Sequence, residues 1–276
     1  MIKSYKNYII FYYILFAVAM GVAAFCDLKI DIFLNNPQNP VAIWFCNMGE
    51  IPAKLVFPLA GTLLFYISEV KWQKIVSAII ALGGGAYLGI HIAQYFFEGD
   101  YKWAFGVVFG LYFGVFLMLI GKLCVIPEEY IKGLRVLAIA GIILVLAESG
   151  VIEAMKYRWG RVRFRDLLAA GSYDAFTPWY HLNGLTYNKS FPSGHTGGAG
   201  ASYLAMLLPF VFPKAKEKKL LCFALPLIYT SIVGFTRLVM GAHYLSDISM
   251  GGTVTFTIVL ITIAVLDRKC KFDDGK

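Results

Sequence analysis

The chain has 276 residues, of which 59% are hydrophobic and only 15% are charged, and its mean hydropathy is +0.67. Soluble domains carry about a quarter charged residues, so this composition excludes a soluble protein and indicates a membrane protein. The net charge of +8 does not indicate a nucleic-acid partner, because the lysines and arginines lie in short clusters between apolar runs.

Eight apolar runs near bilayer length follow one another along the chain. The basic start and the long first run predict an uncleaved signal anchor. We therefore expect an all-α, polytopic transmembrane helix bundle of about eight spans, forming a single membrane domain over residues 1–276. The runs cover residues 8–25, 51–67, 75–97, 103–124, 136–155, 196–212, 220–235 and 245–266.

Lysine and arginine clusters predict the orientation in the membrane. They precede the first span and follow each even-numbered span, so all lie on one side if the N and C termini are inside. The opposite loops are long or acidic, except that residues 157–190 are rich in arginine. The clusters are Lys3 and Lys6; Lys71 and Lys74; Lys122, Lys132 and Arg135; Lys214, Lys216, Lys218 and Lys219; and Arg268, Lys269 and Lys271.

Glycines recur at a spacing of four on two neighbouring spans. Gly85 and Gly89 lie on the third span, and Gly106, Gly110 and Gly114 form a row on the fourth. This pattern predicts close helix packing rather than chemistry. The five cysteines show no CxxC pair and no metal-ligand spacing, so neither a zinc site nor a disulfide framework is indicated.

The segment KYRWGRVRFRD, residues 156–166, places five cations just after the fifth span. A cationic cluster on the outer side breaks the positive-inside pattern and therefore predicts an anionic partner. Taken alone, the cluster is explained equally well by contact with anionic lipid headgroups. Its members are Lys156, Arg158, Arg161, Arg163 and Arg165.

The segment NKSFPSGHTGG, residues 188–198, begins the sixth span on the same side. Pro192 suits a helix start, Ser193 can cap it, and Gly194 lets a ligand approach the backbone. Exposed N–H groups at a helix start attract phosphate. Without other motifs, the segment is simply a good helix start with His195 as an interfacial polar residue.

The segment TRLVMGAHYLSD, residues 236–247, joins the seventh and eighth spans, again on the outer side. His243 and Asp247 are four residues apart, so one helical turn lets the carboxylate hold an imidazole N–H. Such a pair alone is usually structural. Three motifs of complementary chemistry on one face, however, favour a shared phosphate site.

Phosphate chemistry assigns roles to these side chains. Cations and N–H groups neutralise the charge on the non-bridging oxygens. His243, which has the carboxylate neighbour, is expected to attack phosphorus, and His195 is expected to protonate the departing oxygen. No aspartate-rich site occurs, so neither a metal nor another cofactor is implied. The expected phosphate ligands are Lys156, Arg163, Ser193, Gly194 and Arg237.

The three segments closely resemble the motifs KxxxxxxRP, PSGH and SRxxxxxHxxxD of the type 2 phosphatidic acid phosphatase (PAP2) superfamily. Here they stand at residues 156–164, 192–195 and 236–247. The resemblance implies an integral membrane lipid phosphatase that forms a phosphohistidine at His243. It further implies that Asp247 orients that ring and that His195, after acting as the acid, activates water.

The chain departs from the family pattern in two residues and in length. Phe164 replaces the proline that ends the first motif, which affects the loop after Arg163, and Thr236 replaces a serine while keeping a hydroxyl. Compact bacterial members have three spans before the first motif, whereas this chain has five. We therefore expect a six-span catalytic core with two extra helices, divided into N-terminal spans 1–133 and core spans 134–267.

Four further polar residues are candidates for binding the headgroup or supporting the site. Glu148 lies inside the fifth span, where a carboxylate either serves function or hydrogen-bonds a neighbouring helix. Arg158, Arg161 and His181 lie in the long outer loop, where a headgroup would be selected. His91, in the third span, is expected to be a packed, hydrogen-bonded core residue.

The expected partners are a lipid phosphate substrate and the bilayer, with no obligate protein partner. The expected location is the cytoplasmic (inner) membrane, with the site facing the periplasm or outside. The resemblance suggests undecaprenyl diphosphate first, then phosphatidylglycerol phosphate, phosphatidic acid or lipid A phosphates. The alternatives are a lipid phosphotransferase using the same site and an anionic lipid or phosphate transporter. Transport predicts an internal repeat, which the sequence lacks.

Overall fold

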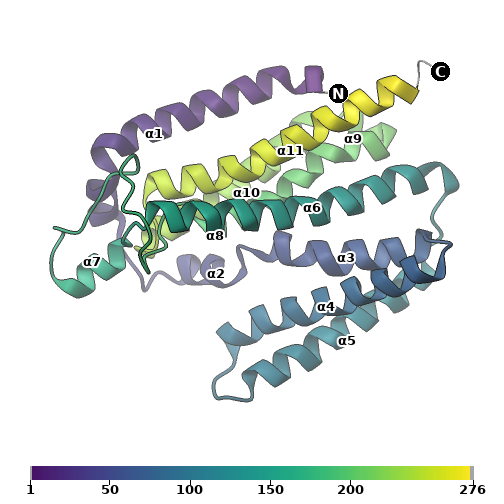
Figure 1. The fold of residues 1–276 in the computed structure, drawn as a ribbon, viewed down its shortest axis with the longest axis horizontal. Coiled ribbons are helices and arrows are strands. Elements are labelled where there is room, and N and C mark those ends of the chain that lie inside the picture. Colours follow the sequence, from purple (N-terminus) through teal and green to yellow (C-terminus); the bar gives the residue numbers. More distant parts are fainter. Residues whose placement is uncertain (1, 274–276) are drawn as a thin grey trace.

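The computed structural model describes residues 2–273, with side chains as far as residue 268, and every regular element in that range is a helix (Figure 1). Lys269 and Lys271, expected on the inner side, lie outside the described side chains. The α-helices are α1 (Lys6–Leu34), α2 (Pro40–Met48), α3 (Ile51–Ile67), α4 (Lys71–Phe96), α5 (Lys102–Leu123), α6 (Glu128–Trp159), α7 (Phe164–Ala170), α8 (Gly194–Ala199), α9 (Leu208–Val211), α10 (Lys219–Val239) and α11 (Leu245–Asp273). The 3-10 helices are η1 (Ile2–Tyr5), η2 (Gly200–Leu207) and η3 (Pro213–Lys216).

Seven helices in the described range are long and apolar enough to cross a membrane, with η1 and α1, α2 and α3, and α6 and α7 each counted together. The expected sixth span, residues 196–212, differs from the prediction because it is broken into α8, η2 and α9. Its glycines pack too closely for side chains. A Cβ on Gly197 would lie 2.2 Å from Oε1 of Glu148, and one on Gly200 would lie 2.9 Å from Cβ of Thr255. Glycine and Pro209 also weaken a regular helix.

The helices α4 and α5 form an antiparallel pair beside α3, at the edge of the bundle (Figure 1). A Cβ on Gly89 would lie 2.1 Å from the carbonyl oxygen of Gly106, and one on Gly110 would lie 2.2 Å from that of Gly85. Only glycine permits so close an approach, so the predicted packing of the two glycine rows is confirmed. The far face of α5 exposes large side chains such as Tyr112, suited to contact with lipid.

Of the remaining long helices, α6, α10 and α11 pack around the broken segment, and α1 packs against α10 and α11. Their shared core includes Tyr12 on α1, Tyr203 on η2 and Phe256 on α11. The rings of Tyr12 and Phe256 stack with centroids 3.9 Å apart. Burial of such large rings contributes strongly to stability, so this core fixes α1 against the C-terminal helices.

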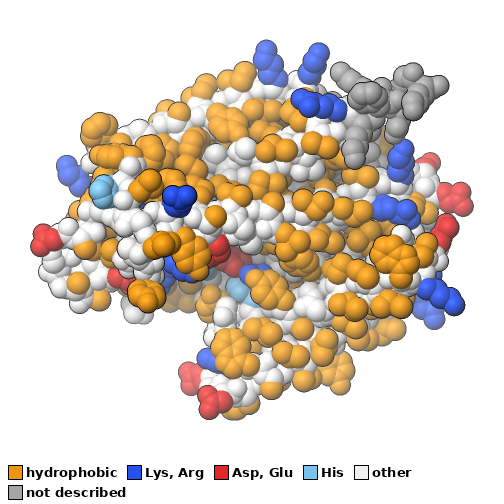
Figure 2. Space-filling model, in the orientation of Figure 1, with side chains coloured by type: hydrophobic (Ala, Val, Ile, Leu, Met, Phe, Trp, Pro, Cys, Tyr) orange, Lys and Arg blue, Asp and Glu red, His pale blue; other side chains and the backbone are white. Residues whose placement is uncertain are grey.

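The two ends of the bundle differ in character. The start of α1 and the end of α11 lie at one end, and α7 with the long loop after it lies at the other (Figure 1). Apolar side chains cover most of the length between the ends, and charged side chains gather mainly near them (Figure 2). The ends of α6 and α10 and the starts of α8 and α11 meet at the α7 end, which is where the motif residues lie.

Candidate active site

The fold brings the three motif segments together. Lys156 lies in the last turn of α6, and Arg237 lies in the last turn of α10. His195 lies in the first turn of α8, Asp247 lies in the first turn of α11, and His243 lies in the turn between α10 and α11. His195 interacts electrostatically with both Arg237 and His243. The residues that the sequence assigned to one face therefore form one cluster.

His243 is held at one ring nitrogen. Its Nδ1 lies 2.8 Å from the carbonyl oxygen of Ser190 and 3.5 Å from Oδ2 of Asp247. Because a carbonyl only accepts hydrogen bonds, Nδ1 carries the proton and Nε2 carries the free lone pair. Burial, with a further contribution from nearby Arg237, lowers the pKa of His243 to about 4, so the imidazole is neutral at pH 7. A neutral ring with a fixed tautomer is the form that a nucleophile needs.

Asp247 is fully buried, and it has hydrogen-bond partners other than His243, the one partner that the sequence predicted. Its Oδ1 accepts from Nη1 of Arg161 at 2.7 Å. Its Oδ2 accepts from the hydroxyl of Ser190 at 2.5 Å and from the backbone N–H of Tyr244 at 3.0 Å. The carboxylate therefore holds both His243 and the Ser190 segment to which that ring donates.

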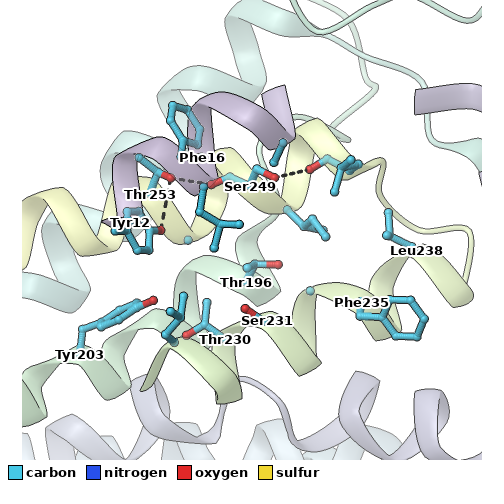
Figure 3. A pocket seen from close by; sticks show the side chains of 17 residues that line it. Tyr12, Phe16, Thr196, Tyr203, Thr230, Ser231, Phe235, Leu238, Ser249 and Thr253 are labelled. Carbon is cyan, nitrogen blue, oxygen red and sulfur yellow. Dashed lines mark hydrogen bonds between the residues drawn. The ribbon is translucent and has the colours of Figure 1, made fainter. Parts of the chain in front are cut away.

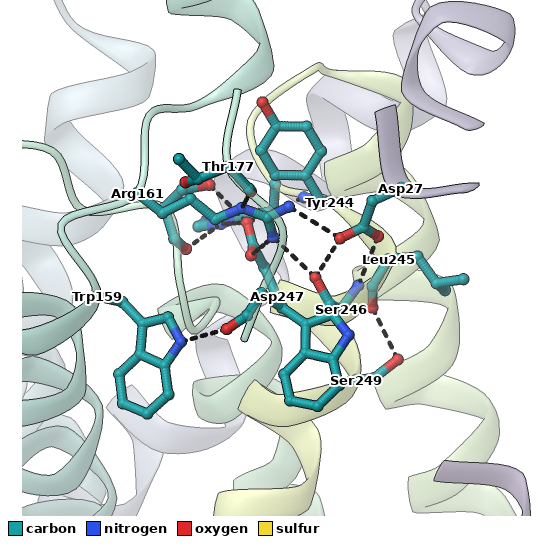
Figure 4. Close-up of polar contacts among 12 residues, drawn as sticks. Asp27, Trp159, Arg161, Thr177, Tyr244, Leu245, Ser246, Asp247 and Ser249 are labelled. Atoms are coloured by element: carbon teal, nitrogen blue, oxygen red, sulfur yellow. Dashed lines mark hydrogen bonds and ion pairs between the residues drawn. The ribbon is translucent and has the colours of Figure 1, made fainter. Parts of the chain in front are cut away.

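Arg161 does not reach a headgroup, because it is only 1% exposed. Its Nη2 donates to Oδ2 of Asp27 at 2.9 Å, and its guanidinium lies 4.0 Å over the ring of Tyr244. Figure 4 shows the guanidinium between the carboxylates of Asp27 and Asp247. Of its two suggested roles, binding a headgroup or supporting the site, the structure favours support.

Asp27, near the end of α1, is a site residue that the sequence analysis missed. Its Oδ1 accepts from the backbone N–H of Ser246 at 3.0 Å, and its Oδ2 accepts from the Ser246 hydroxyl (Figure 4). The pair ties α1 to the start of α11. A signal for Asp27 was present, because a carboxylate next to an apolar span is rare without a function or a partner.

His195 has a different carboxylate, which the sequence analysis also missed. Its Nδ1 lies 3.1 Å from Oε1 of Glu50, between α2 and α3, while its Nε2 is buried without a hydrogen-bond partner. Burial, reinforced by the positive charge of Arg237, lowers the pKa of His195 to about 3. Nothing in the spacing of the sequence connects Glu50 to His195, which lies 145 positions later.

Two arginines at the site lack counterions within the described part of the chain. Arg237 is 5% exposed, its Nη1 donates to Sγ of Cys46 at 2.7 Å, and its Nε has no partner. Nε of Arg163 is likewise buried without a partner. Both arginines act electrostatically on His243. A buried cation without a carboxylate is costly, so this arrangement is suited to an anionic ligand.

Lys156 and the start of α8 complete the predicted phosphate ligands. Nζ of Lys156 lies 2.6 Å from Oε1 of Glu153 and would lie 3.3 Å from a Cβ on Gly194. Ser193 is fully buried, and its hydroxyl oxygen accepts from the backbone N–H of Thr196 at 3.3 Å. The predicted helix cap at Ser193 is confirmed, and contact with phosphate stays a prediction for these residues.

The remaining predicted residues differ in their place: two are exposed, in the last turn of α6 and in the loop after α7, and Glu148 lies beside the cluster, facing Gly197 on α8. The exposed two, Arg158 and His181, have no side-chain contact with the cluster. Glu148 is 5% exposed and accepts from the hydroxyl of Ser149 at 3.2 Å. His91 lies 3.0 Å, through Nε2, from the carbonyl oxygen of Asn47, which confirms the predicted hydrogen-bonded core histidine.

Two cavities adjoin the cluster. One of about 410 Å³ lies between α3, α4 and α6 and is lined by Glu50, Glu148 and Lys156 among others. Charged and histidine side chains gather in the hollow between the α4–α5 pair and the bundle (Figure 2). The other, about 350 Å³, lies between α1, α10 and α11 and is mostly apolar, with hydroxyls such as that of Thr196 on its wall (Figure 3).

Comparison with known proteins adds one finding. Residues 135–270 match the family model of the PAP2 superfamily. No curated protein and no solved structure matches the chain. The matched region contains every motif residue from Lys156 to Asp247, whereas Asp27 and Glu50 lie before it.

Proposed function

Because the chain belongs to the PAP2 superfamily, whose members are phosphatases, we propose that it hydrolyses a phosphomonoester or diphosphate of a membrane lipid. The observation that carries the proposal is a set of three buried nitrogens without partners: Nε2 of His195, Nε of Arg163 and Nε of Arg237. Buried polar atoms normally have partners. A phosphoryl group has the charge and the acceptor oxygens to satisfy both arginine N–H groups, and Nε2 of His195 can hydrogen-bond its oxygens once that ring is protonated.

The reaction has two steps. First, Nε2 of His243 attacks phosphorus, the bond from phosphorus to the leaving oxygen breaks, and His195 gives that oxygen a proton. The leaving oxygen is the lipid alcohol oxygen of a monoester or the bridging oxygen of a diphosphate. Water then attacks the phosphohistidine and loses its proton to His195, the P–N bond breaks, and phosphate leaves. Arg163, Arg237 and Lys156 balance the charge on the non-bridging oxygens throughout, so the mechanism requires no metal.

The substrate and the membrane side are further parts of the proposal. Undecaprenyl diphosphate is the favoured substrate, on the family resemblance, and the site faces outward from the cytoplasmic membrane. Within residues 1–276, spans 134–267 form the catalytic core and spans 1–133 form the N-terminal part. Tyr187, which is fully exposed on the long loop, offers a test of the side. A cysteine at this position should react with a membrane-impermeant maleimide in intact cells.

The test of function is phosphate release from several lipid phosphates in detergent, with and without EDTA. We expect release that EDTA does not change and that His243→Ala abolishes. Transfer of the phosphoryl group to an added lipid alcohol in place of water would indicate a phosphotransferase. Folded protein that releases nothing, or an active His243→Ala variant, would refute the mechanism and favour binding or transport.

A further inference from the structure

The corner between α2 and α3 lies against the cluster, although it precedes the family match by more than 80 residues. Cys46 accepts from Arg237, and Glu50 pairs with His195. The hydroxyl of Tyr229, on α10, donates to the carbonyl oxygen of Gly49 at 3.1 Å. The corner is therefore fixed to both α8 and α10.

Glu50 uses both of its carboxylate oxygens. Oε1 lies 3.1 Å from Nδ1 of His195, and Oε2 lies 3.2 Å from Nζ of Lys54, one turn along α3. An ionised carboxylate is only an acceptor, so Nδ1 must carry the proton. This fixes the tautomer of His195 and leaves its unpartnered Nε2 as the atom available to a substrate.

The helix α4 braces the corner at two places. Nζ of Lys54 donates to the hydroxyl of Tyr87 at 2.5 Å, and Nε2 of His91 lies 3.0 Å from the carbonyl oxygen of Asn47. Tyr87, Lys54, Glu50 and His195 thus form a continuous chain of polar contacts, which runs from α4 to the cluster.

Among the charged groups around His195, Glu50 has a different effect on the protonation of the ring from the others. The titratable groups that face this ring are Arg237 from α10, His243, His91 from α4 and Glu50. The positive charge of Arg237, and of either histidine when protonated, opposes a proton on His195. Glu50 is the one of the four that favours the proton.

We infer that Glu50, held in place by Lys54 and Tyr87 of the α3–α4 contact, is a positioning residue that fixes the tautomer of His195 and supports its protonated form. The inference rests on the proposed function, in which His195 protonates the leaving oxygen. It gives the α4–α5 pair a role, because α4 fixes the residue on which the acid depends.

The test compares Glu50→Gln with wild type and with Glu98→Gln, an exposed acidic control far along the chain in the loop after α4. The substrates are a lipid phosphate, whose alkoxide leaving group needs a proton, and p-nitrophenyl phosphate, whose leaving group does not. We expect Glu50→Gln to lower kcat/KM by about 10- to 100-fold for the lipid and by only a few-fold for the aryl ester.

The pH profile supplies a second readout. An amide cannot support the imidazolium, so the alkaline limb of kcat, which reports the enzyme with its anionic substrate bound, should move down by about one pH unit in Glu50→Gln. Protonation of the substrate affects the pH profiles of both proteins equally, so it does not contribute to the difference between them. Glu50→Asp should recover part of the rate. If Glu50→Gln does not purify as folded protein, Tyr87→Phe should shift the limb in the same direction by a smaller amount.

The outcomes separate the two proposals. Equal losses for both substrates with an unmoved pH limb, or rates equal to those of Glu98→Gln, would overturn the role of Glu50 while hydrolysis by wild type stands. An unmoved limb in Tyr87→Phe, when that variant carries the test, would overturn it as well. Wild type that releases no phosphate from either ester would instead refute the proposed function.

Discussion

The two histidines of the site are held in opposite ways. The side chain of His243 is 3% exposed, and Asp247, Arg161 and Asp27 form a closed buried network behind it. The side chain of His195 is 21% exposed and has one carboxylate partner, Glu50. Both rings are held at Nδ1, but the group behind His243 is a network of two carboxylates and a guanidinium, whereas the group behind His195 is the single carboxylate of Glu50.

This difference follows from what each ring is expected to do. A nucleophile must approach phosphorus along one line, so a rigid support with a fixed tautomer favours attack. An acid that later serves as a base must meet first the leaving oxygen and then water, so its reactive nitrogen has to stay open. The network behind His243 lies mostly within residues 135–270, the region of the family match. The carboxylate partner of His195 comes instead from the α2–α3 corner, which lies before that region.

The largest expected effect separates the two rings by chemistry. His243→Ala should lower kcat/KM by at least about 10³-fold for lipid phosphate and for p-nitrophenyl phosphate, because both require the nucleophile. His195→Ala should lower it by about 10²- to 10³-fold for the lipid and much less for the aryl ester, whose leaving group needs no proton. Steady-state kinetics with both substrates measures this. Equal sensitivity of the two variants to the leaving group would contradict the assigned roles.

The next prediction concerns the closed network. Arg161→Leu leaves Asp27 and Asp247 buried without their cation, which should cost about 3–5 kcal/mol of stability. Thermal unfolding in detergent should then shift down by about 10 °C. The nearby and exposed Arg158 provides the control, since Arg158→Leu should change the midpoint by no more than 1–2 °C, on the order expected for a surface site. A stable Arg161→Leu variant would mean that the network contributes little.

A smaller effect is expected on substrate binding when Arg237, a buried cation without a carboxylate partner among the described residues, is replaced. Arg237→Gln should raise KM for lipid phosphate by about 10-fold, because one charge that balances the phosphate is lost. Removing a buried cation that has no carboxylate partner should not lower the melting temperature. Arg165→Gln, at a half-exposed position, serves as the kinetic control. Unchanged KM together with a lower melting temperature would show that Arg237 is structural.

The smallest expected effect is on stability against pH. Because burial lowers the pKa of His243 to about 4, the folded protein resists a proton that the unfolded chain accepts near pH 6.5. The stability contributed by the neutral ring is therefore complete above pH 6.5 and is lost as the pH falls towards 4, by about 1 kcal/mol per unit. His243→Gln should show a shallower decline of melting temperature between pH 6.5 and 4.5. Parallel curves for the two proteins would contradict the lowered pKa.

Local patterns in the sequence were enough for the membrane class, most of the spans and the motif residues. Apolar runs of bilayer length can only be helices there, because a lipid-exposed backbone must satisfy its own hydrogen bonds. The glycine rows that contain Gly85 and Gly106 predicted a close contact between two helices, because a spacing of four residues places the glycines on one face of each helix. The broken sixth segment was not foreseen, because its irregularity comes from how closely Gly197 approaches Glu148 on another helix.

By itself, the sequence determined which side chains are candidates for the chemistry, since Lys156, His195 and His243 stand in short motifs whose spacing is local. Only the tertiary structure decided their partners. Asp27 meets Arg161 across 134 positions, and Glu50 meets His195 across 145. No periodicity encodes such pairings, because they depend on how whole helices pack, and that packing is set by the summed contacts of many residues.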